Sequence, residues 1–176
     1  MDTKLYPNLA RHAVTEYLTK NITLKPPTDL PEELLRRRSG VFVTIETKTG
    51  NKLRGCIGTY LPTKKNIAEE IIANAIAAAT EDYRFDPITA AEIPALKFTV
   101  SLLREPQQIK NLKELDVEKY GVIVKAADGR SGLLLPDIES VDTPEKQVSI
   151  AAQKGSIDLA RDSVYLFRFT VEKYRD

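Results

Sequence analysis

The chain is poor in the residues that build covalent cross-links and metal sites. Its 176 residues include one cysteine, Cys56, one histidine, His12, one methionine and no tryptophan. A single cysteine excludes an intramolecular disulfide, which suits a reducing compartment. A zinc site would need several carboxylates beside these two residues, and no spacing of Asp and Glu groups them in that way. We therefore expect a cytoplasmic protein without a built-in metal site.

An excess of charge of either sign is also absent. There are 26 Lys and Arg residues against 25 Asp and Glu residues, so the net charge is +1. Nucleic-acid-binding proteins usually carry a basic excess, so this balance argues against nucleic acid as a partner. The run Arg36-Arg37-Arg38 is a local exception, although such runs are typical of solvated helix ends.

Long apolar runs are missing as well. No run approaches the roughly 18 residues that suggest a membrane span. The first residues, up to Pro7, lack the apolar centre of a signal peptide. We expect no membrane association. What the chain does have is 42% hydrophobic and 29% charged residues, which is ordinary for a folded protein of one domain or two small lobes.

Three segments show helical periodicity with recognisable ends. Apolar residues recur at helical spacing from Leu9 to Leu18, after Pro7 in the first turn. An alanine-rich helix follows Asn66, with Glu69 three residues on in the capping-box position. A third helix is predicted to begin at Thr143-Pro144 and to end at Gly155.

Between the helices, alternating apolar residues predict strands. They lie at residues 41–46, from residue 52 onward, and at residues 98–102, 122–124, 133–135 and 165–171. Thr49-Gly50-Asn51 and Asp128-Gly129 are turn sequences that join neighbouring strands into hairpins. Hairpins dominate, and helices are interspersed without a regular βαβ rhythm. The sequence therefore predicts an α+β fold with antiparallel sheets.

The segment most suggestive of chemistry is Leu53-Arg54-Gly55-Cys56-Ile57-Gly58, which we call the hexapeptide. Two glycines permit a sharp turn and a close approach of a ligand to the backbone, so we expect a loop here. A cation nearby favours the thiolate, which makes Cys56 a candidate nucleophile. The candidate ligand-binding residues around it are Arg54, Gly55, Gly58, Thr59 and Arg84.

Structural interpretations of the same residues stay open. A lone cysteine is often buried and inert, and the glycines could only shape a tight strand exit. A dyad of Cys56 with His12 is far apart in sequence but not excluded in space. Arg84 lies in an irregular segment, where it either clamps an anionic group or binds Asp82 or Asp86.

The hexapeptide also carries a family resemblance. Together with its surroundings it resembles the signature of the AMMECR family, and the resemblance covers nearly the whole chain. The matching segments are Gly40–Ile45, the alanine-rich helix, Asp82–Phe85, Val100–Leu103, Gly132–Pro136 and Phe167–Phe169. The length and the Leu-Leu-Leu-Pro segment are most similar to the prokaryotic branch called AmmeMemoRadiSam system protein A. Tyr83 departs from the pattern, since the family usually has proline there, and no cysteine stands near Ala151 and Ala152.

The resemblance implies a fold and possible partners. It implies a single domain over residues 1–176 with two α+β lobes, whose antiparallel sheets are flanked by helices and whose larger lobe is built from both chain ends. It implies association with Memo-type and radical SAM proteins in a modification pathway, and it names no cofactor and no agreed reaction. Three hypotheses follow: an enzyme component acting through Cys56, an adaptor whose glycine loop shapes a partner groove, and a nucleic-acid-binding protein, which the charge disfavours.

Overall fold

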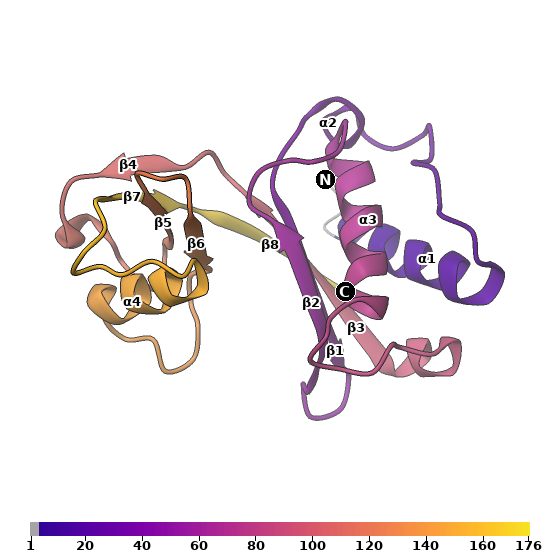
Figure 1. Ribbon diagram of the computed structural model, residues 1–176. Helices are drawn as coiled ribbons and strands as arrows, with labels where there is room; N and C mark the ends of the chain where they lie inside the picture. The colour runs from indigo at the N-terminus through magenta and orange to yellow at the C-terminus, as the bar shows by residue number, and fades with distance from the viewer. Residues whose placement is uncertain (1–3) are drawn as a thin grey trace. The chain divides into compact units, whose positions relative to one another are not determined.

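The computed structural model describes residues 4–176, which form two compact units (Figure 1). The first unit contains Met1–Leu102 together with Glu172–Asp176, and the second contains Leu103–Val171. Each unit combines one four-stranded antiparallel sheet with helices. This confirms the predicted α+β fold with antiparallel sheets.

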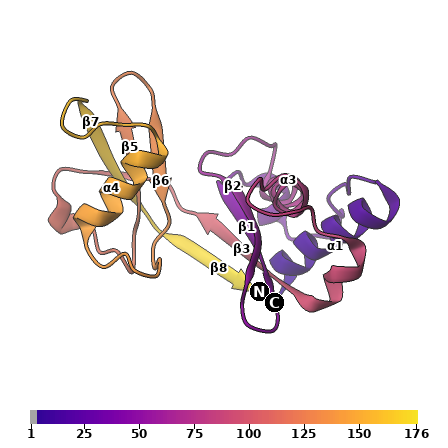
Figure 2. The same cartoon turned by 60° about the horizontal axis from the view of Figure 1, so that its bottom comes forward.

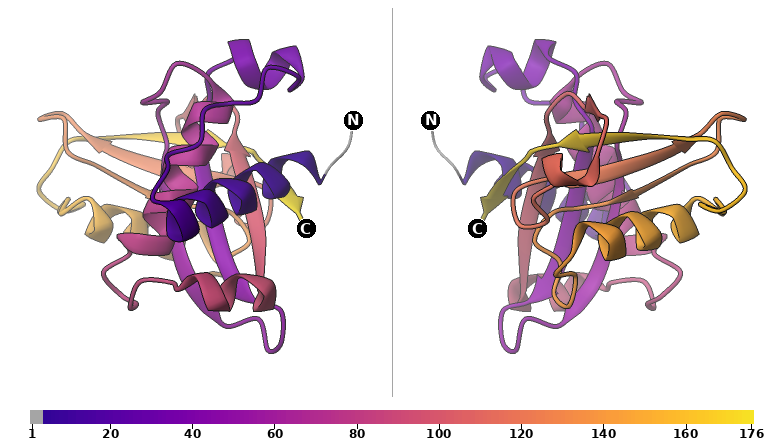
Figure 3. Two further views of the ribbon diagram at one scale, coloured as in Figure 1. Left: turned by 90° about the vertical axis from the view of Figure 1, so that its right-hand side faces the viewer. Right: turned by 90° about the vertical axis from the view of Figure 1, so that its left-hand side faces the viewer.

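The first unit places helices on one face of its sheet. The strand order is β2-β1-β3-β8, and α1 and α3 pack together over one face, as Figures 1 and 3 show. The strands are β1 (Val41–Thr47), β2 (Leu53–Thr59), β3 (Leu96–Leu103) and β8 (Val171–Arg175). The helices are α1 (Leu5–Lys20), α2 (Glu32–Arg36), α3 (Ile67–Thr80) and the 3-10 helix η1 (Ala90–Ala95).

The core of this unit lies between the sheet and the two long helices. Val41, Val43 and Ile45 are fully buried along β1, because alternate side chains of a strand point to the same face. The buried side of α3 is rich in alanine, which lets the helix axis come close to the sheet. Apolar burial of this kind is the main favourable contribution to folding.

The second unit has one helix on its sheet. The strand order is β4-β7-β5-β6, and α4 packs against β5 and β6 (Figure 2). Its elements are β4 (Gln107–Ile109), the 3-10 helix η2 (Leu112–Glu114), β5 (Gly121–Ala126), β6 (Ser131–Leu134), α4 (Pro144–Lys154) and β7 (Val164–Phe169). The short elements β4 and η2 fall in a mixed, charged stretch where the sequence predicted no element.

The ends of the helices agree with their local sequence signals. The Asn66 side chain accepts a hydrogen bond from the Glu69 amide at the start of α3. Thr143 caps α4, and Gly155 follows its last residue. These signals work because each is a contact between residues three or four positions apart.

Two expectations were wrong. The hexapeptide is not a loop, because Leu53–Thr59 is strand β2, paired along β1. The apolar alternation from Tyr165 to Val171 is not one strand, since it divides at Thr170 into β7 and β8, which belong to different sheets. No glycine or proline marks the division. The alternation of apolar residues therefore cannot distinguish one long strand from two short ones.

In the described part of the chain, none of the helices combines the length and the hydropathy that a membrane crossing requires.

Candidate functional site

Cys56 lies in an edge strand, on the sheet face opposite α1 and α3. It pairs with Thr44 of β1, whose neighbours Val43 and Ile45 point toward the helices. The Cys56 Sγ lies 3.3 Å from the Thr44 Oγ1, which is hydrogen-bonding distance for sulfur. The thiol is partly buried and is not in a disulfide. His12 lies on the exposed side of α1, beside Glu16, so the sheet separates it from Cys56.

The backbone of Cys56 is held from outside the sheet. Its N–H donates to the Asp82 Oδ2 at 2.8 Å, and its carbonyl oxygen accepts from the Arg84 Nη2 at 3.4 Å. Both residues follow α3 and reach back across 26 to 28 positions of sequence. At this point of the edge strand, a carboxylate and a guanidinium occupy the place that a neighbouring strand would take.

Asp82 and Arg84 form a bidentate ion pair. The Arg84 Nε and Nη2 donate to the two carboxylate oxygens of Asp82 at 2.9 and 2.7 Å. The hydrogen bond from Arg84 lowers the pKa of Asp82 from 3.8 to about 2, against the opposing effect of burial, and the Cys56 N–H adds to the lowering. Asp82 is 4% exposed, so its charge depends on these partners.

Arg84 keeps part of its donor capacity. The hydrogen bond to Asp82 is the main reason why the pKa of Arg84 is raised, and attraction to Cys56 raises it further. The side chain is 45% exposed. Within residues 4–176 the Nη1 group of Arg84 donates to no protein acceptor. A guanidinium has two edges that can bind an oxyanion, and Asp82 occupies only one of them.

The two glycines of the hexapeptide have packing roles. A Cβ on Gly55 would lie 1.9 Å from the Ala78 carbonyl oxygen of α3. A Cβ on Gly58 would lie 2.3 Å from the Phe42 ring on the neighbouring strand. Glycine is therefore needed here for close approach and not for a turn.

The structure gives Arg54 and Thr59 other partners. Arg54 donates through Nε and Nη2 to the Glu92 Oε1, at 3.1 and 2.8 Å. Thr59 donates to the Glu70 Oε1 at 2.7 Å. Among the predicted site residues, a hydrogen bond thus joins Cys56 and Arg84, whereas Arg54 and Thr59 bind acidic side chains elsewhere in the described part of the chain.

Glu70 is a structural centre that sequence reasoning missed. It is 1% exposed and accepts hydrogen bonds from the Thr59 and Thr63 hydroxyls and from the Thr63 and Lys64 amides. Burial raises the pKa of Glu70, but these hydrogen bonds outweigh it, and the pKa lies below its ordinary value. The sequence does contain a signal for its burial. Glu70 lies on the same helical face as Ile67 and Asn74, and this face enters the core.

The basic run before β1 is engaged within the chain. Arg36 and Arg37 form ion pairs with Glu32 and Glu33, four residues earlier. Arg38 donates to the backbone carbonyls of residues 62 and 64. Among residues 4–176 there is no group of three or more His, Cys, Asp or Glu side chains arranged to hold a metal ion.

Comparison with known proteins places the chain in a family. Residues 7–174 match the AMMECR1 family. A protein of Thermotoga maritima is 48% identical over 170 residues, which cover 97% of each chain. A protein of Clostridium acetobutylicum is 44% identical over 171 residues, where the match covers 96% of this chain and 34% of that one.

A solved structure shares the fold along almost the whole chain. The crystal structure of uncharacterized protein PH0010 from Pyrococcus horikoshii matches with a TM-score of 0.88 and 31% identity, covering 99% of this chain and 91% of that one. The sequence resemblance stated above is thereby confirmed at the level of the family. The chain belongs to the AMMECR1 family.

Proposed function

We propose that this chain is a thiol-dependent component of a modification pathway, with Cys56 as the reacting group. The observation that carries the proposal is the Cys56 thiol, 3.3 Å from the Thr44 hydroxyl, on a residue whose backbone Arg84 also contacts. A hydroxyl and a cation beside a partly buried thiol are the surroundings of a reactive cysteine.

Each neighbour has a distinct role in this chemistry. Arg84 favours the thiolate by charge, and the Thr44 hydroxyl donates a hydrogen bond to it. The proton of the thiol passes to solvent, and the sulfur then gives its electron pair to an electrophilic atom of the substrate, whose leaving group departs with the bonding pair. The Arg84 Nη1, which has no protein partner in the described region, binds an anionic group of that substrate.

Asp82 is a positioning residue in this scheme. Its two oxygens fix the Arg84 fork, and its Oδ2 also accepts from the Cys56 N–H. The guanidinium and the Cys56 backbone are thus held by the same carboxylate. Because Asp82 is buried and bidentate, the position of the guanidinium is set before any substrate arrives.

The proposal extends to the partners and the cellular location of the chain. On the sequence resemblance to the AmmeMemoRadiSam system protein A branch, we also propose Memo-type and radical SAM proteins as partners of this chain in the same pathway. A cytoplasmic location fits a chemistry that needs Cys56 reduced.

The rate of Cys56 alkylation at pH 7 tests the proposal. Iodoacetamide labelling, followed by intact-mass spectrometry, is compared between wild type and Arg84→Gln, with circular dichroism to verify folding. We expect Arg84→Gln to react about tenfold more slowly, because loss of the adjacent cation disfavours the thiolate. Arg84→Lys keeps a cation and retains much of the rate, while Arg54→Gln is the matched control and stays within about twofold. Equal rates in all four proteins would refute the proposal.

A second candidate function is a non-catalytic adaptor, favoured by Tyr83. This side chain is 95% exposed, although its neighbours Asp82 and Arg84 are both held in place. A large aromatic ring presented to solvent from an anchored segment is typical of an anchor for a partner protein. In this case Tyr83→Ala weakens binding to a Memo-type protein in calorimetry, and Cys56→Ser leaves it unchanged. Equal binding by Tyr83→Ala and wild type would dispose of the adaptor.

A further inference from the structure

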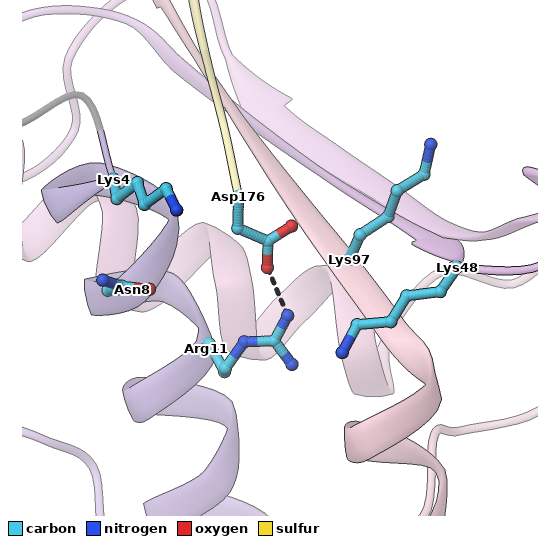
Figure 4. Close-up of a pocket in the computed structure, with 6 residues that line it drawn as sticks. All are labelled: Lys4, Asn8, Arg11, Lys48, Lys97 and Asp176. Carbon is cyan, nitrogen blue, oxygen red and sulfur yellow. Dashed lines mark hydrogen bonds and ion pairs between the residues drawn. The ribbon is translucent and has the colours of Figure 1, made fainter.

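A second polar site lies in the first unit, away from the hexapeptide. It is an open hollow of about 600 Å3 lined by Lys4, Asn8, Arg11, Lys48, Lys97 and Asp176. Figure 4 shows Lys4 and Asn8 at the start of α1, on the other side of Asp176 from Lys48 and Lys97; the Lys48 side chain extends toward Arg11, and the Lys97 side chain points away from it. None of the residues of the Cys56 site lines it. The volume falls within the range of small-molecule sites, roughly 300 to 1,000 Å3.

The hollow gathers positive charge in a chain that is almost neutral overall. Four of its six lining side chains are cationic, and the chain as a whole has a net charge of +1. The one carboxylate, Asp176, is engaged by Arg11 and also accepts from the Phe98 N–H at 3.0 Å. This ion pair neutralises the charge of Arg11, so the positive charge that a ligand would meet comes from the lysines.

Arg11 forms the floor of this site. Besides its ion pair with Asp176, it donates to the carbonyl oxygens of Ile93 and Leu96 at 3.0 and 2.8 Å. Its guanidinium also lies over the Phe98 ring, 4.7 Å from the centroid. These contacts join α1, η1, β3 and the residue after β8 at one point, so the position of the Arg11 guanidinium is fixed before a ligand binds.

Lys48 supplies charge that no carboxylate in the described region compensates. Its Nζ donates to the Pro94 carbonyl oxygen at 2.8 Å, a neutral acceptor, and it has no ion pair within residues 4–176. Lys97 differs, because its Nζ contacts both the Asn51 side chain and Glu46. An ammonium held in place without a counter-charge attracts an anion.

The start of α1 contributes in the same direction. Asn8 is exposed, and its side-chain amide has no protein partner in the part of the chain that the structure describes. The first turn of α1 contains no acidic residue, and no side chain caps its N–H groups. Within residues 4–176, neither a first-turn acid nor a capping side chain offsets the positive end of the helix dipole.

We propose that this hollow binds the phosphoryl group of a small phosphorylated molecule. Ammonium groups act as point charges that suit a tetrahedral dianion from several directions, and the Asn8 amide donates to one of its oxygens. The volume exceeds that of phosphate alone, so the remainder of the ligand occupies the open part of the hollow. The site is independent of the proposed chemistry at Cys56.

Pyrophosphate is the probe that tests the proposal. Titration is followed by amide chemical shifts of the 15N-labelled full chain at constant ionic strength. We expect saturable shifts confined to residues near Lys4–Arg11, Lys48 and Lys97, and weaker binding as sodium chloride rises. Succinate at equal concentration is the comparison for a dicarboxylate, and we expect it to bind more weakly.

Two variants locate the site. Lys48→Met should weaken pyrophosphate binding about two- to fivefold, the range of one exposed charge interaction. Asn8→Asp should weaken binding at least as much while leaving α1 equally or more stable, because an acid suits the first turns of a helix. Lys125→Met, at an exposed lysine of β5, is the matched control and should bind pyrophosphate as wild type does.

Three outcomes would overturn the proposal. They are chemical shift changes scattered over both units, succinate binding as tightly as pyrophosphate, and unchanged pyrophosphate affinity in Lys48→Met and Asn8→Asp.

Discussion

Replacing Asp82 by asparagine tests whether the ion pair holds the edge of the sheet. The pKa of Asp82 falls from 3.8 to about 2 in the folded chain, chiefly through the hydrogen bond from Arg84. Because the folded pKa is the lower one, the pair stabilises the fold above about pH 4, and this stabilisation is lost as the pH falls through about 2. The difference corresponds to about 2 kcal/mol at pH 7.

The assay is urea denaturation followed by circular dichroism at several pH values. At pH 7 we expect Asp82→Asn to lose about 2 kcal/mol, equivalent to about 4–8 °C in melting temperature for a chain of this length. The gap to wild type should close between pH 4 and pH 2, since the wild-type carboxylate becomes protonated there. Other titrating groups cancel in this comparison because both proteins contain them.

Asp86→Asn is the matched control, an exposed carboxylate four residues along the same segment. It should change stability by less than about 0.5 kcal/mol at either pH. A loss in Asp82→Asn that is equally large at pH 7 and pH 2 would refute the reasoning, since the effect would then not depend on the charge of Asp82. A loss no larger than that of Asp86→Asn would refute it as well.

Three further substitutions follow from the same geometry. Gly55→Ala should destabilise by about 2 kcal/mol or more, measured by urea denaturation, because its Cβ would lie 1.9 Å from the Ala78 carbonyl oxygen. Glu70→Gln should cost about 2–3 kcal/mol at pH 7, because one amide oxygen cannot replace a carboxylate that accepts four hydrogen bonds, and the cost should shrink in acid. Thr44→Val should slow Cys56 alkylation about threefold or more, and an unchanged rate would exclude the hydroxyl as a donor to the thiolate.

The features predicted correctly from the sequence are those with local causes. Asn66 with Glu69, and Thr143 with Gly155, mark helix ends through contacts within a few residues. The hairpin around Asp128-Gly129 is equally local, because the turn fixes the pairing of β5 and β6. The α+β class follows from these elements and their order along the chain.

The site depends on contacts that sequence spacing does not reveal. The hydrogen bonds of Asp82 and Arg84 with the Cys56 backbone join residues 26 to 28 positions apart. The hydrogen bonds to Glu70 come from the end of β2 and from the loop before α3. The glycines of the hexapeptide suggested a turn, because the close approach of α3 and Phe42 is a tertiary contact. The sequence left open whether Arg84 binds an anionic group or Asp82, and the structure pairs one edge of its guanidinium with Asp82.

The pH dependence of Cys56 alkylation in the folded chain tests the central claim most directly. An unperturbed thiol has a pKa of about 8.5. If Cys56 is an activated thiol, we expect a half-maximal rate clearly below pH 8.5 in wild type and at higher pH in Arg84→Gln, with Cys56→Ser as the blank. Labelling that begins only when the chain unfolds, or a midpoint at or above pH 8.5 that Arg84→Gln does not move, would show that Cys56 is not an activated thiol.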